Sequence, residues 1–296
     1  MAILKCLVEI LKLSATPPNI IYPIPVLAFL VFSQTSNQDV QLLLFAILFS
    51  SVFYAGVNLW NHVNDIEEDI LAGRRNILIK NPKIRKLTVI LVVFLYLTSF
   101  VLIYFKSNDG ILLFLVCSIV TWIYSDKIIF GRFVRRWKEH YMTEVLTYVI
   151  AVPTFTLTLW SIFDKISIKA LALSVSITLL MLSGTFLKDI KDTTSDELVG
   201  LKTLAVVFSP SKLLKFSVMM SWLYYLSIII FIKLDVYDQL DLLALCPALL
   251  LAYSTSKYQI NRWKISPKLV KPIRIMLYSS ILSLILFIIL GTLFQT

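Results

Sequence analysis

Long apolar runs alternate with short polar segments along the whole chain. A membrane-spanning helix needs about 20 predominantly apolar residues. We place nine nearly charge-free runs at 19–38, 40–64, 87–105, 110–125, 145–163, 170–187, 216–232, 242–256 and 275–296. The eighth run is short and contains Pro247. Since no run alternates with the period of two that a membrane strand requires, the pattern predicts an all-α polytopic membrane protein with nine transmembrane helices.

The composition agrees with a chain that lies mostly in lipid. Of the 296 residues, 58% are hydrophobic and 16% are charged, with a mean hydropathy of +0.83. A soluble domain carries about 25% charged residues. This difference excludes a soluble enzyme, a disordered tail and a nucleic-acid-binding module. Three widely spaced cysteines, Cys6, Cys117 and Cys246, form no CxxC pair and predict small buried apolar residues.

The basic residues predict how the spans are oriented. The formal net charge is +10, from 28 Lys and Arg residues against 18 Asp and Glu residues. All but four of these basic residues lie in the N-terminal segment or in the connections after the second, fourth, sixth and eighth runs. Because Lys and Arg favour the cytoplasmic side of a membrane, we expect the N-terminus and these connections there. The expected partner of the positive charge is the lipid bilayer, with no role for nucleic acid.

A short segment precedes the first span. Lys5, Glu9 and Lys12 interrupt its apolar residues, so we expect no cleavable signal peptide. The apolar residues recur at helical spacing, which favours a helix lying in the membrane interface over residues 1–16. We expect a single domain over residues 1–296.

Two groups of polar residues fall at the predicted cytoplasmic ends of the second and sixth runs. The first group is Asn58, Asn61, Asp65 and Asp69, and the second is Asp189, Asp192 and Asp196. Steps of three or four residues put each group on one helical face. Stacked carboxylates near a membrane are costly unless a cation neutralises them. Mg²⁺ prefers carboxylate, phosphate and water oxygens, so the two groups together predict a magnesium site that grips a diphosphate.

Nearby basic residues would neutralise the remaining phosphate charge. The candidates are Arg74, Arg75, Lys127, Arg132, Lys188 and Lys202. Such a site suits ionisation of an allylic diphosphate in a water-poor chamber, because metal ions stabilise the leaving pyrophosphate. An isolated acid at a helix end is usually only solvated, so the argument depends on the two matched groups. We expect Glu67 and Glu68, which lie off the stacked face, to be solvated, and His62 to point away from Asn61 and Asp65.

At these positions the sequence resembles the UbiA superfamily of intramembrane prenyltransferases. The resemblance rests on two motifs, Asn61-x3-Asp65-x3-Asp69 and Asp189-x2-Asp192-x3-Asp196, the second followed by Gly200 and Thr203-Leu204. It implies nine helices around a central apolar cavity. It also implies a cytoplasmic-side cap formed by the connections after the second and sixth spans.

The family has a tyrosine followed by basic residues after its fourth helix. Tyr124 occupies that place here, and either Lys127 or Arg132 would be its basic partner. Glu144 lies where naphthoate-type relatives have a glutamate, although an acid at a helix N-terminus is an equal explanation. The Arg-Pro pairs of many relatives are absent, since the chain reads Gly73-Arg74-Arg75-Asn76 and Thr16-Pro17-Pro18-Asn19.

The resemblance also implies a role for each motif residue. The implied Mg²⁺ ligands are Asn61, Asp65, Asp69, Asp189, Asp192 and Asp196, among which Asp65, Asp69, Asp192 and Asp196 are catalytic. The implied substrate-binding residues are Asn61, Arg74, Tyr124, Lys127, Arg132, Lys188 and Lys202. The implied reaction moves a polyprenyl group from a prenyl diphosphate, such as geranylgeranyl diphosphate, to a hydrophobic acceptor. That acceptor is an aromatic quinone precursor or a lipid.

Two alternatives stay open. A UbiA-type terpene cyclase would ionise the same diphosphate and capture the cation with its own double bonds, without an external acceptor. A membrane transporter would place ionisable groups near the bilayer midplane between broken helices. The acidic residues of this chain gather instead at one surface.

Overall fold

The computed structural model is built from helices, with no strand in the part of the chain that it describes. The described residues are 2–15, 24–71, 73–129, 131, 133, 135–190, 197 and 200–294. Eight segments in these ranges are long and apolar enough to cross a membrane. They are α4 (Val40–Asn64), α7 (Pro82–Lys106), α8 (Asn108–Ser125), α9 (Tyr141–Phe163), α10 (Ile168–Asp189), α13 (Pro210–Lys233), η2 (Gln239–Leu245) joined to α14 (Ala248–Ile260), and α15 (Val270–Phe294). The chain is therefore a multi-pass membrane protein.

These eight segments overlap the second to ninth predicted runs. The first predicted run, 19–38, contains α3 (Ile24–Gln34), which is 11 residues long; residues 16–23 lie outside the described ranges. The eighth span is broken, because η2 ends before Pro247 and α14 begins directly after it. Proline has no backbone N–H to continue a helical ladder, which explains the break at this position.

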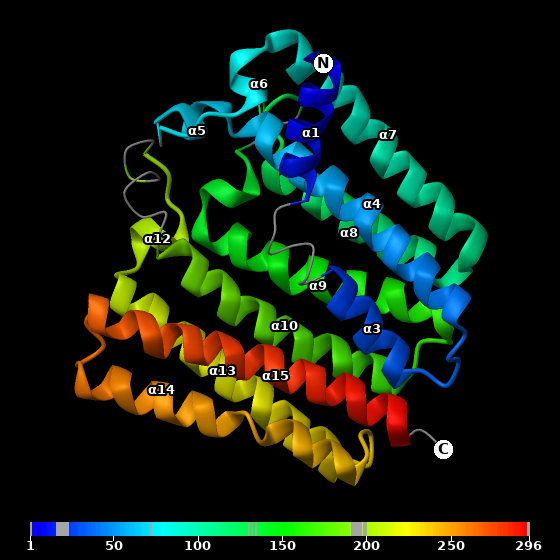
Figure 1. Ribbon diagram of the computed structural model, residues 1–296, viewed down its shortest axis with the longest axis vertical. Helices are drawn as coiled ribbons and strands as arrows, with labels where there is room; N and C mark the ends of the chain where they lie inside the picture. Colours follow the sequence, from blue (N-terminus) through cyan, green and yellow to red (C-terminus); the bar gives the residue numbers. More distant parts are fainter. Residues whose placement is uncertain are drawn as a thin grey trace.

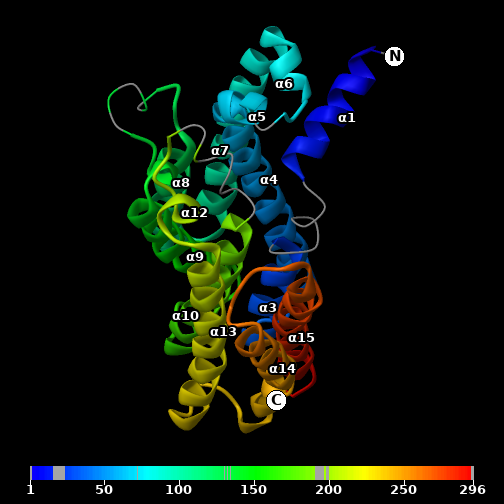
Figure 2. The ribbon, with the colours of Figure 1, turned by 90° about the vertical axis from the view of Figure 1, so that its left-hand side faces the viewer.

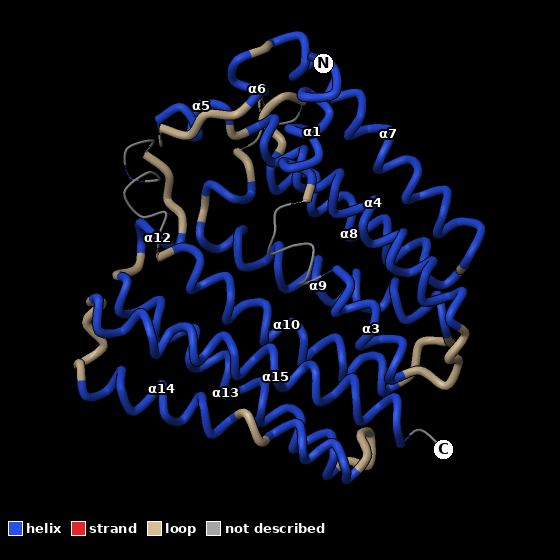
Figure 3. Tube along the Cα trace, viewed as in Figure 1, coloured by secondary structure: helices blue, strands red, loops and turns tan. Residues whose placement is uncertain are grey.

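The helices lie side by side, with their connections gathered at two opposite ends (Figures 1 and 3). Helix α10 packs between α9 and α13, α4 packs against α7, and α15 packs against α3 and α14. The described parts of the connections that follow α4, α8, α10 and α14 lie at the same end (Figure 1), and these connections carry most of the basic residues of the sequence. This end also carries the short helices α5 (Ile66–Leu71), α6 (Ile77–Lys80), η1 (Trp137–Glu139), α12 (Leu204–Val207) and η3 (Pro267–Leu269).

Small residues let the central helices approach closely. The hydroxyl groups of Ser183 on α10 and Ser221 on α13 lie 2.7 Å apart. At the crossing of α3 and α15, a side-chain carbon on Gly291 would lie 2.3 Å from the carbonyl oxygen of Ser33. Close packing at small residues brings helices together inside a membrane, because the hydrophobic effect does not drive apolar helices out of apolar lipid. They fix the frame that holds the polar end of the bundle.

The N-terminal helix α1 (Ala2–Ser14) stands beside the end that carries α5 and α6 (Figure 2). It is tied to the bundle where the Asn58 side-chain amide donates to the carbonyl oxygen of Ser14, at 2.9 Å. Its apolar residues Leu7, Val8 and Leu11 are exposed. An exposed apolar row on a helix beside the polar end suits the membrane interface.

Candidate functional site

The first acidic motif lies where α4 ends and α5 begins. Asp65 caps α4, and its backbone N–H donates to the carbonyl oxygen of Asn61 at 3.0 Å. The backbone of Asp65, at φ −94° and ψ 18°, departs from α-helical geometry, and the motif residues then face different partners. Asn61 accepts a hydrogen bond from the hydroxyl of Ser125 at 3.0 Å, whereas Asp65 and Asp69 contact separate basic residues.

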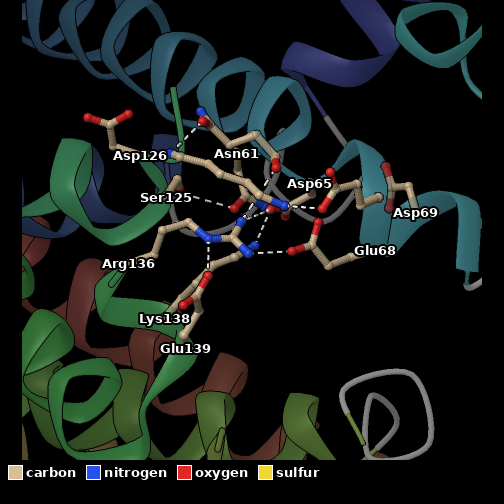
Figure 4. Close-up of polar contacts among 12 residues, drawn as sticks. Asn61, Asp65, Glu68, Asp69, Ser125, Asp126, Arg136, Lys138 and Glu139 are labelled. Carbon is tan, nitrogen blue, oxygen red and sulfur yellow. Dashed lines mark hydrogen bonds and ion pairs between the residues drawn. The ribbon is translucent and has the colours of Figure 1, made fainter. Parts of the chain in front are cut away.

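Arg136 is the centre of an ionic network at this junction. Its side chain is 2% exposed and donates to three carboxylates (Figure 4). Nη1 lies 3.2 Å from Asp65 Oδ1, Nε lies 2.6 Å from Glu139 Oε1, and Nη2 contacts Glu68 Oε1. Burial alone lowers the pKa of Arg136, but the hydrogen bonds to Glu68 and Glu139 outweigh it and hold the pKa above its usual range. The guanidinium therefore stays charged and ties the junction of α4 and α5 to the segment that carries η1.

Glu68 is part of this network, so the expectation that it is solvated is wrong. Its side chain is 14% exposed, because Arg136 covers it. Burial raises the pKa of Glu68, yet the hydrogen bond and the charge of Arg136 lower it more, and the net shift is downward. The second carboxylate oxygen, Oε2, is buried and has no hydrogen-bond partner among the described residues. Glu67 is 71% exposed, as expected.

Two lysines approach the motif from the connection after α8. The Nζ of Lys138 contacts Asp65 Oδ1, and both side chains are 14% exposed (Figure 4). Lys127 contacts the exposed Glu67, on the outer side of the motif. Its backbone N–H donates to Asn64 Oδ1 at 2.7 Å, which ties this connection to the last residue of α4. Arg132, the other predicted basic residue, lies outside the described residues.

Asp69 faces away from Arg136 and lies beyond Glu68 in Figure 4. It is 2% exposed, and its two oxygens accept from Arg74 Nη1 at 3.2 Å and Asn76 Nδ2 at 3.1 Å. The Nδ1 atom of His62 lies 3.8 Å away. Burial raises the pKa of Asp69, but the hydrogen bond and charge of His62, followed by the charge of Arg74, produce a net downward shift. The structure thus pairs Asp69 with the predicted substrate residue Arg74.

The second acidic motif falls at the edge of the described residues. Helix α10 ends at Asp189, but the side chain of Asp189 and all of Asp192 and Asp196 lie outside the described part. The flanking residues Lys188 and Lys202 are both exposed. The positions of the predicted ligands in this motif therefore stay predictions.

The chain after the second motif is bonded to the segment that carries Arg136. The Lys202 backbone N–H donates to the carbonyl oxygen of Glu139 at 3.0 Å, and the Tyr141 N–H donates to the carbonyl oxygen of Lys202 at 2.9 Å. The buried Glu144 accepts from the N–H of Leu204 at 3.4 Å, so it links α9 to the first residue of α12. These contacts place the flank of the second motif beside the network of the first.

The donor chemistry at the first motif fits a hard divalent cation. Within the described ranges, no three His, Cys, Asp or Glu side chains are arranged to hold a metal ion. Asp65 and Glu68 nevertheless meet at Arg136, and Oε2 of Glu68 is a buried acceptor without a donor among the described residues. Mg²⁺ prefers carboxylate and amide oxygens of this kind, and the predicted ligands of the second motif lie beyond the described part.

Aromatic residues of α4, α8 and α9 pack together near the first motif. The rings of Trp60 and Trp122 stack with centroids 4.1 Å apart, and the indole N–H of Trp60 donates to the carbonyl oxygen of Trp122 at 3.1 Å. The ring of Tyr124 lies 6.3 Å from that of Tyr148 on α9. Trp60 is fully buried and directly precedes Asn61 on α4, so this aromatic pair adjoins the first motif.

The central apolar space of the bundle is narrow. Two voids of about 10 Å³ each lie in its interior, and three buried residues, Leu30, Ile177 and Leu284, line both of them. Tyr54 and Phe155 line one of the voids, and Leu173 lines the other. In the part of the bundle that the structure describes, side chains therefore leave little open space between these three residues.

The sequence analysis missed Arg136, Lys138 and Glu139. All three lie directly before the fifth run, in the sequence Arg135-Arg136-Trp137-Lys138-Glu139. This density of charge next to a span is a usable signal. It does not reveal which residue is buried, because Arg136 and Asp65 are 71 residues apart and meet through tertiary packing.

Comparison with known proteins agrees with this architecture. Residues 22–281 match the model of the UbiA prenyltransferase family. A protein of Archaeoglobus fulgidus described as uncharacterized is 40% identical over 286 residues, covering 95% of this chain and 98% of the relative. A UbiA homolog from Archaeoglobus fulgidus bound to GPP and Mg²⁺ has a TM-score of 0.66 at 18% identity, covering 96% of this chain and 98% of that one.

A second structure, from a study of digeranylgeranylglyceryl phosphate synthase in membranes, has a TM-score of 0.70 at 15% identity. It covers 97% of this chain and 99% of its own. At these identities the two structures demonstrate a shared fold. Together with the family match over residues 22–281, they establish that the chain belongs to the UbiA prenyltransferase family.

Proposed function

We propose that this protein is an Mg²⁺-dependent intramembrane prenyltransferase. It transfers a polyprenyl group from a prenyl diphosphate to a hydrophobic acceptor, which is an aromatic quinone precursor or a lipid. The observation that carries this proposal is the buried network of Asp65, Glu68, Arg136 and Lys138 at one end of a family-typical helical bundle. Homologs of known structure bound to GPP or DMAPP together with Mg²⁺ support the same chemistry.

We place this end of the bundle on the cytoplasmic side. The basic connections that gather there support the assignment, because Lys and Arg favour cytoplasmic loops. In this proposal α3 belongs to the first of nine spans, and residues 1–296 form a single domain with an interfacial α1. The connections after α4 and α10 form the cap over the site.

The proposed Mg²⁺ ligands are Asn61, Asp65, Asp69, Asp189, Asp192 and Asp196, and we add Glu68 to them. Glu68 joins them because its Oε2 is a buried acceptor beside Asp65 that lacks a donor in the described part. Bound Mg²⁺ neutralises the diphosphate and stabilises the pyrophosphate as it leaves.

The basic residues divide into a fixed group and a movable one. Arg136 is held by Asp65, Glu68 and Glu139 at once, so it orients the carboxylates. Among the described residues, Lys138 has a single carboxylate partner, Asp65, and we assign it to the diphosphate when Asp65 holds the metal. The proposed substrate contacts of Arg74, Tyr124, Lys127, Arg132, Lys188 and Lys202 complete this set.

The aromatic pair of Trp60 and Trp122 excludes water from the reaction in this proposal. Once the diphosphate leaves, the allylic cation reacts with any nearby water, so the walls must exclude it. The stacked rings of Trp60 and Trp122 form such a wall beside the first motif. Their π faces also attract positive charge.

Pyrophosphate release tests this function. The purified protein in detergent is given Mg²⁺ and geranylgeranyl diphosphate, with and without a panel of acceptors, and we expect release that needs an acceptor. Asp65→Asn should abolish it. Asp164→Asn is the matched control, since Asp164 lies at the opposite end and accepts from the hydroxyl of Ser36 at 2.6 Å. Release without an acceptor would assign a cyclase instead. No release with any of several prenyl chain lengths would refute both.

A further inference from the structure

We propose that a groove on the outside of the bundle binds the hydrocarbon chain of an anionic membrane lipid. The groove lies between α9, α10, α12 and α13 and encloses about 400 Å³. This volume falls in the range of about 300–1,000 Å³ that is typical of ligand pockets. Figure 2 shows α12 at the start of α13, beside α9. The proposal does not depend on the prenyltransferase activity.

The walls of the groove complement an apolar chain. Three of the chain's six methionines, Met142, Met219 and Met220, line it together with aromatic residues such as Phe186 and Phe216. Methionine side chains are flexible and polarisable, so they adapt to a ligand of irregular shape. A polar ligand in such a lining would lose its hydrogen bonds to water without replacement, whereas a hydrocarbon chain loses none.

The groove opens toward the lipid. Met142 and Met219 on its rim are 62% and 47% exposed. On the following turns, Leu146 and Val149 of α9 and Leu223 of α13 are also exposed. Both helices are long and apolar enough to span a membrane, so this surface faces hydrocarbon. A lipid chain therefore reaches the groove without leaving the bilayer.

A basic residue stands at the polar end of the groove. Lys212 is exposed in the first turn of α13, one turn before Phe216 on the same helical face. A lipid phosphate there gains the attraction that membrane-proximal lysines exert on anionic headgroups. The neighbouring Lys215 is directed elsewhere, since its Nζ lies 5.6 Å from the ring centroid of Trp263. This charge complementarity selects an anionic lipid over a neutral one.

Native mass spectrometry of the purified full-length protein tests the site. Phosphatidylglycerol and phosphatidylcholine with identical chains are titrated separately. We expect the complex with one phosphatidylglycerol to form at a lower lipid concentration than the complex with one phosphatidylcholine. Val145→Phe fills the groove from α9 and should weaken retention of both lipids. Val149→Phe, one turn further and outside the lining, is the matched control and should retain wild-type binding. Met220→Trp fills the groove from α13 and replaces Val145→Phe if that variant does not fold.

The headgroup assignment has its own pair of variants. Lys212→Gln should reduce the preference for phosphatidylglycerol about five-fold, the effect of about one lysine near an anionic surface. Lys215→Gln should leave the preference unchanged. Equal loss in Val145→Phe and Val149→Phe, or a full preference in Lys212→Gln, would overturn the proposal. Displacement of the bound lipid by glycerol phosphate, which has no hydrocarbon chain, would also overturn the proposal. So would a dimer that Val145→Phe dissociates, because the groove would then bind a second copy of the protein.

Discussion

Replacing Lys138 with methionine should change metal and diphosphate affinity in opposite directions. Lys138 contacts Asp65, which is also a proposed Mg²⁺ ligand. A metal ion on Asp65 has to displace this lysine, so removing the lysine favours the metal. The same lysine is then unavailable to the diphosphate, so diphosphate binding weakens. Methionine keeps the length and the apolar stem of the side chain, which limits the change to the charge.

The contact sets the size of the effect. Lys138 and Asp65 are each 14% exposed, so solvent screens the pair only partly. A hydrogen bond to a charged group contributes about 1.5–3 kcal/mol to stability. Asp65 keeps Arg136 at 3.2 Å after the lysine is displaced, which places the cost at the lower end. At 1.4 kcal/mol for each factor of ten, we expect about ten-fold tighter metal binding in Lys138→Met.

Electron paramagnetic resonance of Mn²⁺ measures the metal affinity without substrate, and pyrophosphate is titrated afterwards. Lys127→Met is the matched control, since it removes an equal charge from a pair with the exposed Glu67. Its metal affinity reports the general effect of one lost positive charge near the motif. If Lys138→Met binds Mn²⁺ no more tightly than Lys127→Met, Lys138 does not compete for the metal. If Lys138→Met binds pyrophosphate as tightly as the unchanged protein, the assignment of Lys138 to the diphosphate is refuted.

Three further predictions concern Arg136, Glu68 and Leu284. Arg136→Met removes the partner of three carboxylates and should destabilise the protein by about 3–5 kcal/mol. The measurement is the midpoint of thermal unfolding in detergent, which should fall. An unchanged midpoint would contradict the structural role of Arg136. The pKa of Glu68 is lowered from 4.5 in the folded state, so its contribution is complete above that pH and is lost as the pH falls below it. Glu68→Gln should therefore flatten the fall in thermal midpoint below about pH 4.5. Leu284→Ala joins the two interior voids, costs about 2–5 kcal/mol and should shift the preferred prenyl diphosphate toward longer chains in a competition assay. Leu173→Ala, which lines one void, should not shift the preference.

The spans were predictable because local composition fixes them. The second run, predicted at 40–64, coincides with α4, since Asp39 caps its start and Asp65 its end. Such boundaries depend on neighbours in the sequence. The break at Pro247 depends on the same local chemistry. In contrast, the narrow interior could not be predicted, because its volume depends on how Leu30, Ile177 and Leu284 of three separate helices meet.

The site shows the same division between local and tertiary information. The spacing of Asn61, Asp65 and Asp69 places them at one helix end, and the structure keeps them there. Their partners come from far along the chain, as Arg136 does for Asp65. Glu68 was assigned to solvent because a helical wheel considers only its own helix. The segment before α9 covers that face and buries the carboxylate.

These partners change the argument for the metal. Stacked carboxylates near a membrane demand positive charge, and the sequence analysis assigned that charge to Mg²⁺. The structure supplies much of it from the chain, since Asp65, Glu68 and Asp69 each contact an arginine. The repulsion among these three carboxylates is therefore offset by arginines and does not by itself require a metal. Two features of the described part still favour a metal: the buried Oε2 of Glu68 has no donor there, and Lys138 has one carboxylate partner there, Asp65, which a metal ion can take over. A competition between Lys138 and the metal follows from that arrangement, and a purely structural salt-bridge network would not produce it.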